Sequence, residues 1–285
     1  MKFSICNEIF KHLTLEQTFR FVKETGYDAI ELAPFTLADS VTLISQAERR
    51  RIRALAEQIG LEISALHWLL VKPDGLYINH PEQGIRRRTS DYFVELVKFA
   101  SDLGASSIII GSPNQRRRLP DVTEEQSRQW TLETLTPAIL LGELRHVTLC
   151  IEPLSKVETN FINTAAEAIE LTKAICSSAF QIILDVKAMY AEGTPLPEII
   201  TSSRGHVAYF HANDRNLSGP GFGDVDFIPI FQALHQINYQ GYVSVEVFEY
   251  NETPEQIAEG SLHTLQKAYL KALQLYNDSA TFHEC

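Results

Sequence analysis

The chain has 285 residues, of which 45% are hydrophobic, and this is enough to bury the core of one large α/β domain. Its formal net charge of −11 argues against a nucleic-acid partner, because nucleic-acid surfaces depend on Lys and Arg to displace the counterions of phosphates. No run of about 18 consecutive apolar residues occurs, so a membrane partner is not expected either.

Short β-branched runs alternate with longer stretches of helical periodicity along the whole chain. Eight strands are predicted, at residues 3–7, 29–32, 62–68, 107–111, 147–152, 181–185, 207–211 and 243–247. Helices are predicted at residues 15–25, 46–58, 87–103, 123–143, 165–175, 197–201, 228–237 and 254–275. Gly26, Gly60 and Gly104 follow the first three of these helices, where a left-handed residue commonly ends a helix.

Eight strand–helix units predict a single (β/α)₈ TIM barrel over residues 1–285, with 278–285 as a flexible tail. An open doubly wound sheet is the alternative. Such a sheet usually carries a glycine-rich phosphate turn after its first strand, and the corresponding segment 6–10 contains no glycine. No Pro-, Gly- or Ser-rich linker divides the chain, which favours one domain.

The cysteines and the amino terminus bear on location. Cys6, Cys150, Cys176 and Cys285 are scattered without a CxxC pair, which is typical of reduced thiols. Met1 leads directly into a predicted strand rather than into a secretory signal, so a cytoplasmic location is expected. A homo-oligomer is also an expectation, although one sequence does not mark the surface that would form it.

Three basic triplets occur, at residues 49–51, 86–88 and 116–118. They could form anion-binding patches. The first two lie inside predicted helices, and a run of like charges usually belongs to a solvated surface. We therefore interpret the triplets as solvated faces.

The last four predicted strands each run from apolar residues into a side chain that can bind a metal. In a TIM barrel the carboxyl ends of the strands build the active site. A lone strand-end acid often caps a helix or pairs with Lys, but four consecutive strands ending in this way favour a shared cation, which would offset the cost of burying the acids. The residues are Glu152, Asp185, His211 and Glu246.

The identity of the metal follows from the donor atoms. A set of carboxylates with one imidazole and no thiolate indicates one divalent ion, Mn²⁺ as first choice, with Mg²⁺, Co²⁺ or Zn²⁺ as alternatives.

The segment 151–164, with the sequence IEPLSKVETNFINT, is similar to a segment of known enzymes. It resembles the xylose isomerase-like TIM barrels of the sugar phosphate isomerase/epimerase group, and within them the D-tagatose 3-epimerase type of ketose epimerase. The resemblance extends over nearly the whole chain. It implies that the four strand-end residues bind the metal, that Glu152 and Glu246 also serve as acid and base, and that Glu158 contacts the substrate.

Two positions depart from that family. The epimerases carry a His three residues after the metal-binding Asp, where this chain has Ala188. They also carry an Arg six residues after the metal-binding His, where this chain has Leu217, with Arg215 nearby. Both family residues hold substrate oxygens, so the resemblance implies the metal centre but leaves ketose 3-epimerisation open.

The function indicated is a metal-dependent sugar or polyol isomerase or epimerase, working through an ene-diolate at one divalent ion. The main alternative is a keto-sugar or keto-inositol dehydratase or lyase, in which Lys187 or Arg215 would bind a carboxylate or protonate the leaving oxygen. DNA repair of the endonuclease IV type would need several strand-end histidines in addition to His211, and His67 is the only strong candidate. The acidic net charge of the chain also disfavours this function. A barrel that binds a ligand without turnover also remains open.

Further residues near the predicted strand ends are candidates for substrate contact. His67 and Trp68 end the third strand, where an aromatic ring would form a wall for a sugar ring, although a packed core histidine is an equal alternative. Glu31 and Ser112 are expected to contact the substrate, each with a structural alternative. Asn7 and Asn213 fall at the same level.

Two further segments contain groups that resemble ligand-binding motifs. The turn 218–224 has the glycines to hold a phosphate, but it lacks a Lys and a Walker pattern, so a shaped loop near the substrate is favoured. The terminal residues 282–285 contain His, Glu and Cys, and we interpret them as a frayed tail.

Overall fold

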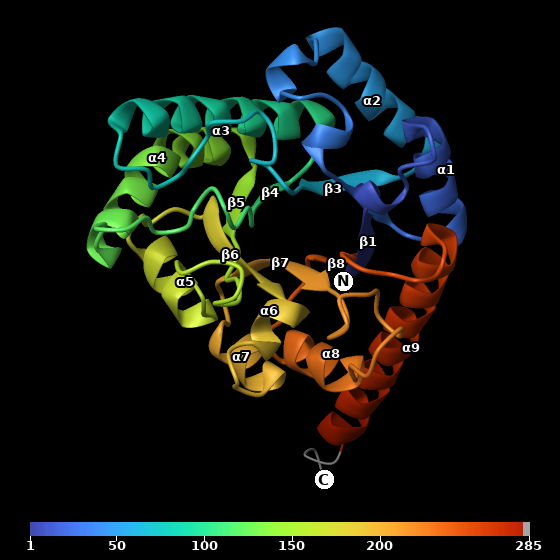
Figure 1. Ribbon diagram of the computed structural model, residues 1–285. Helices are drawn as coiled ribbons and strands as arrows, with labels where there is room; N and C mark the ends of the chain where they lie inside the picture. Colours follow the sequence, from blue (N-terminus) through green and yellow to red (C-terminus); the bar gives the residue numbers. More distant parts are fainter. Residues whose placement is uncertain (282–285) are drawn as a thin grey trace.

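A computed structural model describes residues 1–281 of the chain. Its eight parallel strands close into a barrel in sequence order, and helices surround the barrel (Figure 1). The predicted (β/α)₈ TIM barrel is therefore confirmed. The strands are β1 Lys2–Cys6, β2 Ala29–Leu32, β3 Glu62–Leu66, β4 Ser107–Ile110, β5 Thr148–Ile151, β6 Phe180–Asp185, β7 Val207–Ala212 and β8 Tyr242–Val245.

The helices begin and end close to the predicted positions. Thr14 and Thr123 each form a capping box with the glutamine three residues later. Gly26, Gly60 and Gly104 all adopt positive φ directly after a helix, as expected. The helices are α1 Leu15–Thr25, α2 Gln46–Ile59, α3 Gln83–Leu103, α4 Glu124–Arg145, α5 Ala165–Lys173, α6 Val186–Tyr190, α7 Leu196–Ser202, α8 Phe227–Gln236 and α9 Pro254–Thr281.

Two features at the carboxyl side differ from the prediction. Helix α6 starts immediately after β6, because the Asp185 side chain accepts a hydrogen bond from the backbone N–H of Ala188 and so caps the helix. Helix α9 continues through the polar residues 277–279 to Thr281, since Asn, Asp and Ser only modestly disfavour a helix and no Gly or Pro lies between residues 277 and 281. The predicted tail at 282–285 lies outside the described residues.

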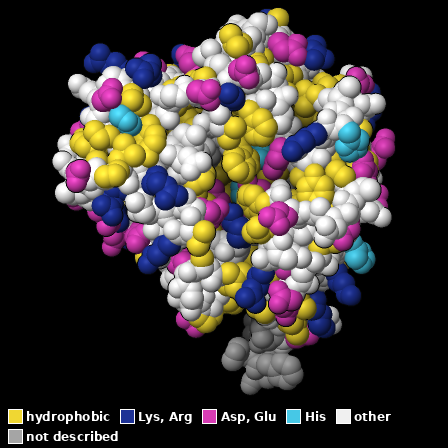
Figure 2. All heavy atoms as spheres, in the orientation of Figure 1, with side chains coloured by type: hydrophobic (Ala, Val, Ile, Leu, Met, Phe, Trp, Pro, Cys, Tyr) yellow, Lys and Arg dark blue, Asp and Glu magenta, His cyan; other side chains and the backbone are white. Residues whose placement is uncertain are grey.

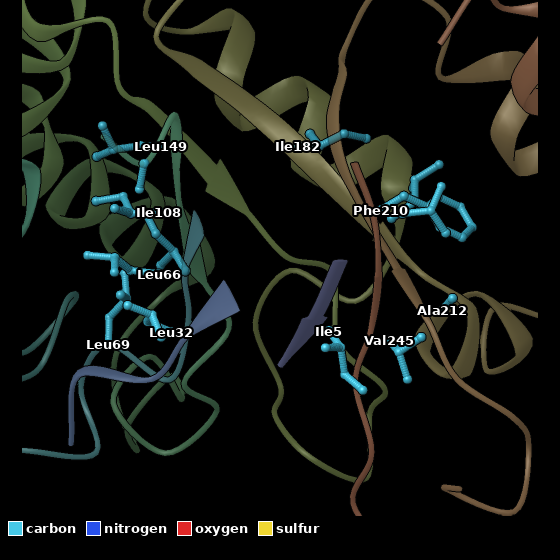
Figure 3. Packing of buried hydrophobic residues seen from close by; sticks show 14 of the residues in the cluster. Ile5, Leu32, Leu66, Leu69, Ile108, Leu149, Ile182, Phe210, Ala212 and Val245 are labelled. Atoms are coloured by element: carbon cyan, nitrogen blue, oxygen red, sulfur yellow. The ribbon is translucent and has the colours of Figure 1, made fainter. Parts of the chain in front are cut away.

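Alternate residues of the strands face opposite sides, as the pleat requires. Figure 3 shows one set, which packs with the surrounding helices in the main hydrophobic core and includes Leu66, Ile108, Leu149 and Phe210. The other set fills the barrel interior with a smaller cluster of Ala65, Ile109, Cys150, Ile183 and Tyr209. This division fixes which strand-end residues point into the mouth of the barrel.

The interpretation of the basic triplets as solvated is wrong for two arginines. Arg49 is buried and donates hydrogen bonds to the carbonyl oxygens of Ile44 and Val41, and it pairs with Asp102 at 2.9 Å. Arg116 has no exposed surface. Sequence pattern misses such positions because the acceptors are backbone carbonyls that the fold brings to the guanidinium.

None of the helices within residues 1–281 is both long and apolar enough to span a bilayer.

Gly142 in α4 lies directly against the first residues of β5. A Cβ atom at this position would lie 2.4 Å from the carbonyl oxygen of Val147 and 3.1 Å from Cδ1 of Leu149. We expect Gly142→Ala to lower the free energy of unfolding by about 1–3 kcal/mol, because crowding outweighs the helical preference of Ala. The matched control is Gly84→Ala in α3, where the nearest atom is 3.9 Å away.

In the control, Ala should be neutral or stabilise by up to about 1 kcal/mol. Urea unfolding of both variants measures the difference. Equal free energies of unfolding for the two variants would show that the contact between α4 and β5 is looser than described.

Candidate metal centre and active site

Four side chains at the carboxyl ends of β5 to β8 project into the mouth of the barrel. Glu152, Asp185 and His211 each stand two residues after a member of the interior cluster, so they face the same side of their strands. Glu246 follows β8 directly. We call these four residues the ligand cluster.

The ligand cluster is compact and almost completely buried. One ligand atom from each residue lies within 4.8 Å of the others, and each residue is at most 5% exposed. Nδ1 of His211 lies 3.0 Å from Oε2 of Glu246, and neither atom satisfies hydrogen-bond geometry with a protein group. Unpaired buried donors and acceptors facing one point fit a divalent cation, whose charge would also offset the three carboxylates.

Glu31 determines how the His211 ring is oriented. Its carboxylate oxygens lie 3.1 and 3.2 Å from Nε2 of His211, and one of them accepts a hydrogen bond of 2.9 Å from the Tyr209 hydroxyl. A carboxylate behind the ring leaves the other ring nitrogen free for a metal, which is a common arrangement in metal sites. Glu31, which was expected to contact substrate, is fully buried behind His211 and does not line the pocket.

Asn213 fixes Asp185 and the start of α6 together. Its side-chain nitrogen donates to Oδ2 of Asp185 at 2.6 Å, and its side-chain oxygen accepts from the backbone N–H of Lys187 at 2.8 Å. The predicted rim residue Asn213 is thus completely buried and supports the ligand cluster.

A pocket opens above the ligand cluster and holds about 370 Å³ of space, counting its mouth. Figure 2 shows the same face, with histidine atoms visible in a hollow between hydrophobic and charged side chains. Besides members of the cluster, the lining includes the predicted substrate-binding residues His67, Trp68, Glu158 and Lys187. Apolar walls come from Ile109, Pro113, Leu154 and Phe248.

Lys187 carries a positive charge inside this pocket. Its Nζ lies 2.8 Å from Oε1 of Glu158 and 3.9 Å from the centre of the Phe248 ring. Burial alone would lower the pKa of Lys187, but Asp185, Glu246 and other nearby carboxylates raise it above its ordinary value. The ammonium is therefore protonated at neutral pH.

His67 is also charged. Its Nε2 lies 2.8 Å from Oε2 of Glu8, and its Nδ1 lies 3.4 Å from Oε1 of Glu31. Burial would lower the pKa of this imidazole, but Glu8 and Glu31 raise it to about 9. The sequence left two interpretations of His67 open, a packed core histidine and a wall of the substrate pocket. The residue is 1% exposed and also lines the pocket, so it fits both.

Three other predicted contact residues do not line the pocket. The Arg215 side chain is 57% exposed and lies over the Tyr190 ring, away from the ligand cluster. The Ser112 hydroxyl accepts a hydrogen bond from the backbone N–H of Leu70, and so it shapes the loop after β3. Asn7 binds the segment after β2 through Thr36 and Ala33.

The glycine-rich turn 218–224 is shaped around an internal acid. The fully buried carboxylate of Asp214 accepts hydrogen bonds of 3.0–3.3 Å from the backbone N–H groups of Gly221, Gly223, Asp224 and Val225. These are the donors that a phosphate would need. The turn is therefore the shaped loop that the sequence favoured.

The two glutamates of the ligand cluster differ in pKa. Burial raises the pKa of Glu152 to about 8, and the adjacent Glu246 and Asp185 contribute to the rise. Burial also acts on Glu246, but His211 outweighs it and lowers the pKa of that carboxyl. Without a metal ion, Glu152 is thus protonated and Glu246 ionised around neutral pH.

Phe248 and Glu8 were not singled out from the sequence. A signal for Phe248 was present, since it continues the alternation of Ser244 and Glu246 and so faces the same side of the strand end. Glu8 lies in a short 3₁₀ helix, Asn7–Ile9, which is too short to be predicted from the periodicity of the sequence.

A family model described as a xylose isomerase-like TIM barrel matches residues 19–268. The chain belongs to this family. The resemblance of this chain to the xylose isomerase-like barrels and their sugar epimerases, stated from the segment 151–164, is thereby confirmed.

Relatives within the family are sugar epimerases. The chain is 26% identical over 273 residues to the 3-dehydro-D-guloside 4-epimerase of Escherichia coli (strain K12), which covers 93% of this chain and 99% of the relative. It is 23% identical to a probable ketose 3-epimerase of Synechocystis sp., with 92% and 88% covered. In fold it is similar to a solved L-ribulose 3-epimerase, with a TM-score of 0.84, 18% identity and 97% of each chain covered.

The raised pKa of Glu152 makes the stability of the metal-free protein depend on pH. Because this carboxyl binds its proton more tightly in the folded state, its contribution is complete below the ordinary pKa of 4.5 and is lost as pH rises to about 8. In the presence of a chelator, we expect the urea midpoint of the wild-type protein to fall over this window, and to fall less in Glu152→Gln.

Addition of a divalent ion should reduce the fall in the wild type, because a cation stabilises the ionised carboxylates. An equal pH slope for the wild type and Glu152→Gln in the chelator would be evidence against a protonated, buried Glu152.

Proposed function

We propose that this chain is a metal-dependent sugar or polyol epimerase or isomerase in which the ligand cluster binds one divalent ion. The observation that carries the proposal is the convergence of three carboxylates and one imidazole, with two unpaired ligand atoms, beneath a pocket at the barrel mouth. The sugar epimerases among the relatives support the same reaction class.

When bound, a divalent ion, Mn²⁺ as first choice, would polarise adjacent carbonyl and hydroxyl oxygens of the sugar and acidify the neighbouring carbon. The proton transfers belong to Glu152 and Glu246. They follow β5 and β8, which are separated by two strands of the barrel, so they approach a substrate from different directions.

Glu246 takes the proton from the carbon next to the carbonyl, and Glu152 returns one to the opposite face of the ene-diolate. Return to the opposite face inverts the carbon, which is epimerisation. Return to the neighbouring carbon would give isomerisation.

Lys187, Glu158, Trp68 and Phe248 position the sugar in this proposal. The ammonium and the carboxylate offer a donor and an acceptor to sugar hydroxyls, and the aromatic side chains form an apolar wall. The charge of Lys187 is matched by Glu158, and the donors of the glycine-rich turn are bound to Asp214. Both observations favour an uncharged sugar over a sugar phosphate.

A lyase remains the second candidate, because the protonated Lys187 lies in the pocket and could donate a proton to a leaving hydroxyl. In that case the product would lack one water. Lys187→Met would then stop elimination while metal-dependent exchange at the carbon next to the carbonyl persisted. Product analysis by NMR separates the two reactions.

The test is deuterium exchange in D₂O with a panel of free ketoses, keto-glycosides and keto-inositols and with Mn²⁺ present. We expect at least one class to incorporate deuterium next to its carbonyl, and this incorporation should stop when the ion is removed. Glu246→Gln should lower the rate by about 10²- to 10⁴-fold, since proton transfer by a positioned side chain contributes that much.

Glu249→Gln is the matched control, because Glu249 is an exposed acid three residues further along the same segment and does not line the pocket. Its rate should equal that of the wild type. Absence of metal-dependent exchange across the whole panel, or an unchanged rate in Glu246→Gln, would refute the proposed function.

A further inference from the structure

We infer that the arginines at residues 116–118, here called the arginine clasp, position the loop 153–163 that follows Glu152 and carries Glu158. This role is separate from the ligand cluster, and its effect on activity rests on the proposed function. The charge pattern of this triplet indicated a solvated surface, but its first member, Arg116, is fully buried.

Arg116 joins the end of β4 to the far end of the loop. Its Nη1 donates to the carbonyl oxygen of Ile110 at 3.2 Å, and its Nη2 donates to that of Ile162 at 3.5 Å. The Ile110 carbonyl also accepts the backbone N–H of Glu152 at 3.2 Å. One carbonyl at the end of β4 therefore binds both the clasp and the residue that enters the ligand cluster.

The guanidinium of Arg116 makes no ion pair in the described part of the chain, although Glu152 and Glu158 are near enough to raise its pKa. Burial lowers the pKa of Arg116 to about 10, so it stays charged at neutral pH. A buried cation held only by carbonyls is costly. The nearby charges of Glu152, which precedes the loop, and of Glu158, which the loop carries, offset part of this cost.

Arg117 and Arg118 bind the middle of the same loop. Nη2 of Arg117 donates to the backbone carbonyl of Glu158 at 2.6 Å. The backbone of Arg118 forms two hydrogen bonds with the side chain of Asn160, at 2.7 and 3.0 Å. The three consecutive arginines thus bind residues 162, 158 and 160.

The two ends of the loop are packed, since Leu154 and Phe161 are buried, but its tip is not. Val157 at its tip is 92% exposed. Ile162 has φ of 59°, a left-handed conformation that is strained for a β-branched residue and persists only where neighbouring contacts impose it. Its carbonyl accepts the backbone N–H of Leu154 as well as Arg116. Fixing the backbone at Glu158 sets how its carboxylate reaches Lys187 and the pocket.

The test compares Arg117→Met and Arg117→Lys with the wild type. Arg117 is exposed, so both variants should fold. We expect Arg117→Met to speed amide hydrogen exchange in residues 153–163, and to raise KM for the active sugar about 3- to 10-fold with little change in kcat, the size expected for one lost hydrogen bond. Arg117→Lys retains a donor and should recover most of both effects.

Arg116→Met should increase exchange over the same residues further. Arg50→Met, which removes an exposed arginine from the first triplet in α2, is the control and should change neither measurement. Hydrogen exchange needs no substrate, so it tests the clasp even if no sugar is turned over. Unchanged exchange in residues 153–163 for both Arg117→Met and Arg116→Met would overturn the inference. So would an unchanged KM together with unchanged exchange in Arg117→Met.

Discussion

The burial of three carboxylates around one imidazole is the arrangement on which the rest of the site depends. Like charges in a space of low polarity repel strongly, and only positive charge nearby makes the arrangement tolerable. The protein provides part of it through Lys187 and His67, whose pKa values are both raised by the acids. A divalent cation would provide the rest, and the raised pKa of Glu152 reflects what is missing without it.

The orientation of His211 is set from inside the barrel. Ser64, Tyr209 and Glu31 form a chain of hydrogen bonds through the interior, and the chain ends on the ring nitrogen that faces away from the other ligands. Burial would raise the pKa of Glu31, but His211 and His67 lower it to about 2, so it remains an acceptor at any physiological pH. The polar residues inside the barrel therefore fix the ring orientation and the tautomer of His211 at the barrel mouth.

The barrel and the ligand cluster were predictable because both follow from short-range pattern. Short β-branched runs between stretches of helical periodicity define the strands, and the residues that end them at the carboxyl edge converge in any closed parallel barrel. Glu158 and Lys187 were also predicted for the pocket, although their ion pair joins residues 29 apart in sequence and became visible only in the structure.

Other contacts could not be read from pattern, because their partners come from distant segments or from backbone atoms. Glu31 lies 180 residues from His211, and nothing near either residue signals the pair. Arg116 was taken for a surface charge because its acceptors are carbonyls of strand β4 and of another loop. The sequence does not show that the backbone N–H groups of the glycine-rich turn bind the buried carboxylate of Asp214 rather than a phosphate.

The most direct test of the account is an anomalous-scattering map of crystals soaked with Mn²⁺. The account predicts one strong peak per chain, about 2 Å from carboxylate oxygens of Glu152, Asp185 and Glu246 and from Nδ1 of His211. A map with no peak among these four side chains, or with Mn²⁺ bound only elsewhere, would contradict it.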